Sequence, residues 1–234
     1  DGGLEAARLA RMAAEEGASA LLVFPPNSMA MGGQLRPEMA IAHFKRLADA
    51  TDLPIILFQY PMATGLGYPT ETLMKIIEAV PSVRAIKDWC ADPMLHERHT
   101  RMLQSLPRPV NVLTTHSAWL MASLTMGASG LLSGAGSVVA DLQVALFNAV
   151  KAKDLRAAQA INDRLYPMQQ AFYAPPFLDM HNRMKECLVL LGRLRRAVVR
   201  PPLMKLPSAE IERLKQALHQ AGIGPDGALA QAAE

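Results

Sequence analysis

The sequence is poor in aromatic residues and in cysteine. Aromatic residues make up 5% of the 234 positions, and the two cysteines are Cys90 and Cys187. Proteins that bind nucleic acid usually combine a strongly basic face with stacking rings, and the net charge here is only +3, so we expect no nucleic-acid partner. Two cysteines are too few for a disulfide framework, which favours a cytoplasmic protein.

Long apolar runs are also missing. Segments such as 20–26 and 54–58 are far shorter than the roughly 20 residues that a membrane-spanning helix needs. No basic stretch followed by an apolar core opens the chain, so we expect neither a signal peptide nor a membrane partner. Hydrophobic residues make up 50% of the chain and charged residues 19%, a balance that excludes an intrinsically disordered protein.

Short apolar segments alternate with amphipathic ones over the first part of the chain. This pattern predicts strands at 18–24, 53–60, 83–89, 110–115 and 130–133, and helices at 4–15, 37–50, 70–80, 93–106 and 118–126. Helices alone are predicted afterwards, at 141–151, 155–173, 181–194 and 208–221. Alternating strands and helices are typical of α/β proteins with a parallel sheet, either doubly wound or closed into a barrel.

Lys87 is the residue that most clearly suggests chemistry. It lies late in an apolar strand, where alternation places Ala85, Lys87 and Trp89 on one face. Burial disfavours the ammonium form and lowers the pKa of a lysine, which is what a Schiff-base nucleophile requires. The alternative is a strand-end lysine whose amine reaches solvent.

The strand before it ends in Phe58-Gln59-Tyr60-Pro61-Met62-Ala63-Thr64-Gly65. Phe58 and Tyr60 share a face, so the Tyr60 phenol could lie beside the Lys87 amine and move protons during imine chemistry. The alternative is that both rings only fill the core.

These segments resemble the dihydrodipicolinate synthase/N-acetylneuraminate lyase family of class I aldolases. That family carries Y-N-x-P-x-x-T-G on one strand and G-I-K on the next, matched here by 58–65 and 85–87. Further matches are Val23-Phe24-Pro25-Pro26, Gly127-Ala128-Ser129-Gly130-Leu131-Leu132-Ser133, Met184-Lys185-Glu186 and Leu190-Leu191-Gly192. The resemblance covers about residues 1–222.

The resemblance implies a TIM (β/α)8 barrel that lacks about its first three strands here, with a C-terminal helical extension. We therefore expect a partial barrel over 1–139, barrel and extension helices over 140–222, and a disordered tail over 223–234. It also implies that Lys87 forms the Schiff base and that no metal and no dissociable cofactor is needed. We expect Tyr60, the nearby phenol on the same face, to be catalytic with Lys87 in place of the family's motif tyrosine. The substrate-binding residues are then Phe58, Thr64, Gly65, His116, Leu132, Gly134 and Arg183.

The chain departs from the family at three positions. The motif tyrosine falls on Phe58, the second relay tyrosine falls on Asn27, and the arginine that binds the aldehyde's carboxylate in the synthase falls on Ala63. We therefore expect an aldolase other than the lysine-biosynthesis synthase. The alternative is a non-catalytic homologue that binds a 2-keto acid and has lost the proton relay.

Several weaker features each allow two interpretations. His116 either contacts substrate or caps the following helix, and Arg183 either pairs with a substrate carboxylate or forms an exposed salt bridge. The amides of 134–137 could bind an anion. His96 and His99 are spaced like a pair on a solvated helix face, and we expect no metal there.

The expected protein is thus a carbon–carbon lyase. Its partners would be pyruvate or another 2-keto acid and an aldehyde or sugar acid. As in other family members, the whole protein is expected to be a homotetramer in the cytoplasm.

Overall fold

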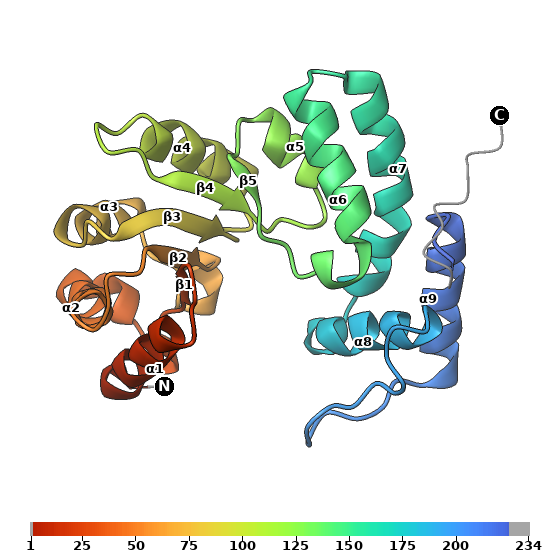
Figure 1. Ribbon diagram of the computed structural model, residues 1–234, viewed down its shortest axis with the longest axis horizontal. Coiled ribbons are helices and arrows are strands. Elements are labelled where there is room, and N and C mark those ends of the chain that lie inside the picture. The colour runs from red at the N-terminus through yellow and green to blue at the C-terminus, as the bar shows by residue number, and fades with distance from the viewer. Residues whose placement is uncertain (1, 225–234) are drawn as a thin grey trace. The chain divides into compact units, whose positions relative to one another are not determined.

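The computed structural model describes residues 2–224, and these residues form two compact units. The first contains residues up to 116 together with 123–132, and the second contains 117–122 together with the residues from 133 onward. Figure 1 labels the helices and strands of both. The predicted disordered tail lies outside the described residues from position 225 onward.

The first unit is built on a five-stranded parallel sheet. Its strands are β1 (Leu21–Val23), β2 (Ile55–Gln59), β3 (Val83–Asp88), β4 (Asn111–Thr114) and β5 (Gly130–Leu131). They lie side by side in chain order, β1-β2-β3-β4-β5, and each neighbouring pair is parallel (Figure 1). Parallel neighbours require a crossover between strands, and helices supply it here.

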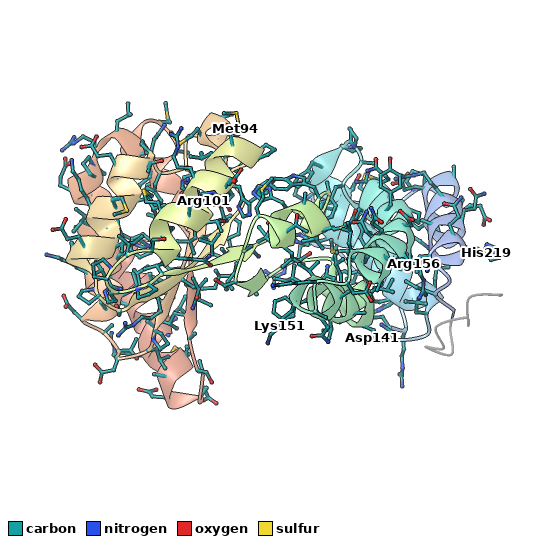
Figure 2. The ribbon with its side chains drawn as sticks, turned by 90° about the horizontal axis from the view of Figure 1, so that it is seen from above. Met94, Arg101, Asp141, Lys151, Arg156 and His219 are labelled. Carbon is teal, nitrogen blue, oxygen red and sulfur yellow. The ribbon has the colours of Figure 1, made fainter. Side chains whose placement is uncertain are left out.

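The helices of this part are α1 (Gly3–Glu15), α2 (Pro37–Ala48), α3 (Thr70–Ala79), α4 (Pro93–Gln104) and the short α5 (Leu120–Thr125), which has residues in both units. The apolar faces of α2, α3 and α4, with Ala6 of α1 packed against them, form one core with strands β1 to β4, and this core includes Phe44, Leu57, Leu73, Ile86 and Val112. The opposite side of α4 faces solvent, as the exposed Met94 and Arg101 show (Figure 2).

The second unit is helical. It contains α6 (Gly136–Lys151), α7 (Leu155–Phe172), α8 (Met180–Leu190) and α9 (Ser208–Gln220). Exposed polar side chains mark their outer faces, among them Asp141, Lys151, Arg156 and His219 (Figure 2). None of the described helices is long and apolar enough to cross a membrane.

The order and type of the elements agree with the prediction, so the α/β class with a parallel sheet is confirmed. The main difference is the start of α6, expected at residue 141 and observed at Gly136. Val139 has a non-helical backbone (φ −118°, ψ 36°), so a first turn joins the main helix across a kink. Helical periodicity in the sequence does not reveal a short turn of this kind before the main helix. The proposed division at residue 139 remains a prediction.

Candidate active site around Lys87

Lys87 lies near the carboxyl end of β3 and is half-buried. Its register partner on β2 is Phe58, and the Lys87 Nζ atom is 5.1 Å from the centre of the Phe58 ring. Burial lowers the pKa of Lys87 below that of an ordinary lysine. The strand therefore presents an amine whose neutral, nucleophilic form is favoured by its surroundings.

Phe58 belongs to a cluster of four aromatic side chains. The rings of Phe24 and Phe58 stack with centroids 4.4 Å apart, and the Tyr60 ring lies 4.5 Å from Phe58 and 5.8 Å from Trp89. The sequence pattern pointed to Phe58 and Tyr60 and placed Trp89 on the face of Lys87, but it missed Phe24. Phe24 comes after the last residue of β1, where strand alternation no longer applies.

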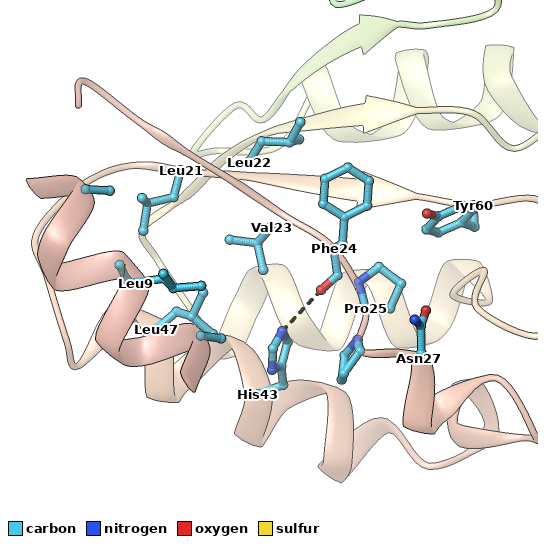
Figure 3. A pocket seen from close by; sticks show the side chains of 14 residues that line it. Leu9, Leu21, Leu22, Val23, Phe24, Pro25, Asn27, His43, Leu47 and Tyr60 are labelled. Atoms are coloured by element: carbon cyan, nitrogen blue, oxygen red, sulfur yellow. Dashed lines mark hydrogen bonds between the residues drawn. The ribbon is translucent and has the colours of Figure 1, made fainter. Parts of the chain in front are cut away.

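Tyr60 is half-buried, and burial raises the pKa of its phenol. It lies at one end of a groove of about 540 Å³ that follows α1, β1 and the segment after β1 (Figure 3). Leu9, Leu22 and Phe24 give this groove an apolar wall, and Asn27 also lines it. The groove also contains His43, whose Nε2 atom is 3.2 Å from the carbonyl oxygen of Phe24.

The loop that carries the motif after β2 is held by a buried glutamine. Gln59 Nε2 donates to the carbonyl of Tyr68 (2.9 Å), and the Tyr68 amide donates to Gln59 Oε1 (3.2 Å). Within the loop, the Thr64 hydroxyl donates to the Pro61 carbonyl (2.7 Å) and accepts from the Leu66 amide (3.2 Å). These bonds give Thr64 a role in shaping the turn.

Gly65 is required at its position in that turn. Its φ is +73°, a left-handed conformation that favours glycine. A Cβ atom there would lie 2.0 Å from the carbonyl oxygen of Ala30, a contact that no side chain could accept. The motif glycine thus lets this loop approach the segment that follows β1.

The next residue on β3, Asp88, joins a buried polar cluster. Its Oδ2 atom lies 2.9 Å from His96 Nδ1 and 3.0 Å from His99 Nδ1, and all three side chains are buried. Burial alone would favour the neutral acid, but hydrogen bonds from the two imidazoles hold the pKa of Asp88 well below its usual value. The expectation that His96 and His99 lie on a solvated face is wrong, because they share the inner face of α4 with Thr100 and Leu103.

His116, expected to contact substrate or cap a helix, lies in the same cluster. Its side chain is 3% exposed, its Nε2 atom is 3.7 Å from Cys90 Sγ, and its ring centre is 5.0 Å from that of His96. Burial lowers the pKa of His116 to about 4. Since α5 begins only at Leu120, the capping interpretation is not supported, and protein groups surround the ring.

The loop after β5 was expected to hold a keto-acid carboxylate through Leu132 and Gly134. The Leu132 amide donates to the Thr114 carbonyl (2.9 Å), so it pairs within the sheet unit. In the second unit, the amides of Gly136 and Ser137 close turns onto Ser133 and Gly134. These amides are engaged within the protein, and the sequence pattern did not reveal this.

A hydroxyl network that sequence reasoning missed surrounds this loop in the second unit. The Tyr173 hydroxyl donates to Ser117 Oγ, and Ser117 Oγ lies 2.7 Å from Ser133 Oγ. Gln143 Nε2 also donates to Ser133 Oγ (3.0 Å). The residues lie far apart in sequence and on different elements, so no motif joins them.

Arg183, expected at the mouth of the site, is buried with 1% of its surface exposed. Its guanidinium donates to the carbonyls of Phe172, Ala174 and Pro175 and to Glu210 Oε1 (2.6 Å). A guanidinium with these four partners stabilises the helical unit, and we do not retain Arg183 as a ligand for a substrate carboxylate.

The profile of the dihydrodipicolinate synthetase family matches residues 3–221. This chain belongs to that family. Two curated relatives are 4-hydroxy-tetrahydrodipicolinate synthases: the protein of Symbiobacterium thermophilum is 31% identical over 94% of this chain and 71% of its own length, and that of Kineococcus radiotolerans is 33% identical over 93% and 67%.

Solved structures of family members share the fold. YagE of Escherichia coli K12, crystallised in complex with pyruvate, superposes with a TM-score of 0.84 at 23% identity, over 94% of this chain and 72% of YagE. The dihydrodipicolinate synthase of Thermotoga maritima gives a TM-score of 0.80 at 22% identity, over 94% and 72%. The dihydrodipicolinate synthetase family is one of aldolase-type carbon–carbon lyases, so the sequence-based recognition is confirmed.

Proposed function

We propose that this chain carries the Schiff-base centre of a class I aldolase, with Lys87 as the nucleophile. The amine of Lys87 attacks the ketone of pyruvate or a related 2-keto acid, and water leaves to give a protonated imine. When a carbon–carbon bond breaks, this imine accepts the electrons of the bond and becomes an enamine. When a bond forms, the imine first loses a proton from the neighbouring carbon, and the resulting enamine donates its electrons to the aldehyde. The reaction needs no metal and no dissociable cofactor. The observation that carries the proposal is the half-buried Lys87 amine at the carboxyl end of β3, in a family whose motif lysine is the nucleophile.

Tyr60 is the proton shuttle in this proposal. Phe58 has no hydroxyl, while the Tyr60 ring lies 4.5 Å from the Phe58 ring that Lys87 contacts. A phenol at this place can move the protons that carbinolamine formation and breakdown require. Pyruvate as the keto acid is supported by its presence in the YagE structure.

The second substrate is an aldehyde with an apolar or aromatic substituent. Phe24, Phe58, Tyr60 and Trp89 surround the approach to Lys87, and the loop carries Ala63 where the synthase has arginine. Aromatic walls favour apolar groups, and a buried anion without a partner would be costly. This argues for a simple aldehyde over a sugar acid, and against the lysine-biosynthesis reaction that the relatives' names describe. Turnover of benzaldehyde above that of an aldehyde bearing a carboxylate would support this choice, and the reverse order would contradict it.

The sheet is proposed to be part of an eight-stranded barrel, with Lys87 at the catalytic face that barrels place at the carboxyl ends of their strands. Among the described residues, β1 pairs only with β2 and β5 only with β4, so each outer strand keeps one edge for a further strand. The groove beside β1, with its apolar wall, is the surface that such strands would cover. The homotetramer and the cytoplasmic location remain predictions. Sedimentation velocity would measure the oligomeric state.

Borohydride trapping tests the proposal directly. The chain, and a version extended upstream with the remaining barrel strands, are incubated with pyruvate, reduced and digested, and the peptide that contains Lys87 is analysed by mass spectrometry. A reduced adduct on Lys87 is expected. If the extended, folded protein forms no adduct with pyruvate or several other 2-keto acids, the aldolase proposal fails.

The rival function is a 2-keto-acid-binding protein without turnover. It is favoured by Phe58 and Asn27, neither of which has the phenol of the family's relay. An adduct on Lys87 without any aldol product, across apolar and polar aldehydes, would support this second function.

A further inference from the structure

A set of four buried side chains beside the proposed active site has the composition of a metal site. The side chains of Asp88, Cys90, His96 and His116 each offer one ligand atom, and these atoms lie within 4.8 Å of one another. Every one of the four residues is at least nine-tenths buried. All four belong to the sheet unit, so the cluster does not depend on how the two units are placed.

We propose that this cluster binds one divalent zinc ion. Zinc prefers four nitrogen, sulfur and oxygen ligands in a tetrahedral arrangement, which a carboxylate, a thiolate and two imidazoles supply. The charges also match, because one carboxylate and one thiolate balance a divalent cation when both imidazoles are neutral. Binding exchanges the ion for the thiol proton of Cys90 and for any proton that the two histidines carry, and those protons pass to solvent.

The distances in the cluster are close to those of a four-ligand zinc site. Cys90 Sγ and His116 Nε2 are 3.7 Å apart, and Asp88 Oδ2 and His96 Nδ1 are 2.9 Å apart. Zinc–ligand bonds of about 2.0 to 2.3 Å place neighbouring ligand atoms about 3.3 to 3.7 Å apart. Binding would therefore move Asp88 Oδ2 and His96 Nδ1 apart by about 0.4 Å or more and draw in any pair that lies further apart, within the 4.8 Å that spans the cluster.

The groups around the four ligands also suit a metal site. Ligand histidines in proteins usually bind a second group through their other nitrogen, and ligand carboxylates accept further hydrogen bonds. Here His96 Nε2 contacts Ser123 Oγ, His99 Nδ1 contacts Asp88 Oδ2, and the Cys90 amide donates to Asp88 Oδ1. His99 is thus a supporting residue of the site rather than a ligand.

The ion would connect three parts of the fold: the end of β3, the first turn of α4 and the segment after β4. Asp88 is the direct neighbour of Lys87, so the metal would fix the end of the strand that presents the reactive amine. The site is structural, and the inference stands independently of the proposed aldolase reaction.

Metal analysis of the purified chain tests the inference without any activity measurement. After chelator treatment and dialysis, the protein is equilibrated with zinc, desalted and analysed for bound metal. About one zinc ion per chain is expected. Replacement with Co²⁺ should give a thiolate charge-transfer band and the intense visible bands of tetrahedral cobalt.

Two variants assign the ligands, and a third is the matched control. Cys90→Ser should lose the charge-transfer band, and His116→Gln should weaken zinc binding at least about 10-fold. Cys187→Ser removes the other buried cysteine, which lies outside the cluster, and should retain metal and spectrum. If Cys90→Ser does not fold, the cobalt spectrum of the Cys187→Ser protein identifies the thiolate by itself. A folded wild-type chain without zinc, or a Cys90→Ser protein with the wild-type cobalt spectrum, would overturn the inference.

Discussion

The Lys87 Nζ atom lies 5.1 Å from the centre of the Phe58 ring, on the neighbouring strand of the same sheet. An ammonium group near an aromatic face gains about 0.5 to 2 kcal/mol. Burial acts in the opposite direction and lowers the pKa of Lys87. The ring that replaces the family tyrosine thus helps to exclude water from the amine but supplies no proton.

Replacing Lys87 with arginine should abolish the pyruvate adduct. The guanidinium keeps the positive charge near Phe58 but does not deprotonate in proteins, so it forms no imine. The free energy of unfolding should change by no more than about 1 kcal/mol, measured by urea denaturation. Lys75→Arg, which alters an exposed lysine paired with Glu71, is the control and should keep the full adduct yield. An adduct in the Lys87→Arg protein would show that another amine is the nucleophile.

Removing the Tyr60 hydroxyl should slow imine formation. Tyr60→Phe is expected to lower the rate of trapping with pyruvate by about 10²-fold, the usual size of one general acid–base contribution. Adding Phe58→Tyr to that variant returns a phenol next to Lys87 and should recover part of the rate. Rapid-quench trapping with borohydride measures the rate of imine formation in both variants. Wild-type rates in Tyr60→Phe would remove Tyr60 from the mechanism.

Gly65→Ala should lower the free energy of unfolding by about 3 kcal/mol or more. The variant combines a left-handed backbone with a Cβ atom 2.0 Å from the Ala30 carbonyl oxygen. Gly17→Ala is the matched control, because Gly17 has φ +83° and nothing within 4 Å of its added Cβ. It should cost about 1 kcal/mol from the backbone alone. Equal losses in urea denaturation would mean that the loop moves away from Ala30 without cost.

His43 should titrate below the usual histidine range. Burial and the nearby Arg46 lower its pKa, and these effects outweigh the opposing hydrogen bond to the Phe24 carbonyl. The folded state then binds fewer protons than the unfolded state, so this residue's contribution to stability falls as the pH drops below about 6.5. NMR titration of the ring proton, assigned with His43→Gln, measures the midpoint. A midpoint at or above 6.5 would contradict the prediction.

Arg183→Leu should destabilise the protein by about 3 to 5 kcal/mol, because it leaves three backbone carbonyls without their buried donor and removes one of the two arginines that pair with Glu210. Arg196→Leu, an exposed arginine further along the chain, should change stability by less than about 0.5 kcal/mol. Urea denaturation of both variants tests whether Arg183 stabilises the fold, instead of binding a substrate carboxylate as the sequence suggested. A stable Arg183→Leu protein with weakened pyruvate binding would restore Arg183 as a substrate ligand.

Local patterns predicted the strands and helices around the sheet well, because the strands are short apolar runs and the helices carry apolar stripes. The same patterns failed where a contact joins distant segments. His96 and His99 repeat with Leu103 on one helical face, yet only the position of Asp88 on β3 explains why imidazoles occupy that face. Tyr173 and Ser117 are 56 positions apart, and no spacing rule connects them.

The amide of Gln59 binds both the N–H and the C=O of Tyr68, as an adjacent strand would. The loop between these two residues is therefore anchored at its ends by Gln59 and shaped within by Thr64. Met62 and Ala63 lie exposed on that loop. Evolution could exchange such residues and alter the preferred aldehyde while leaving the framework around the lysine intact. Substrate preference can therefore change at this loop without a change of fold.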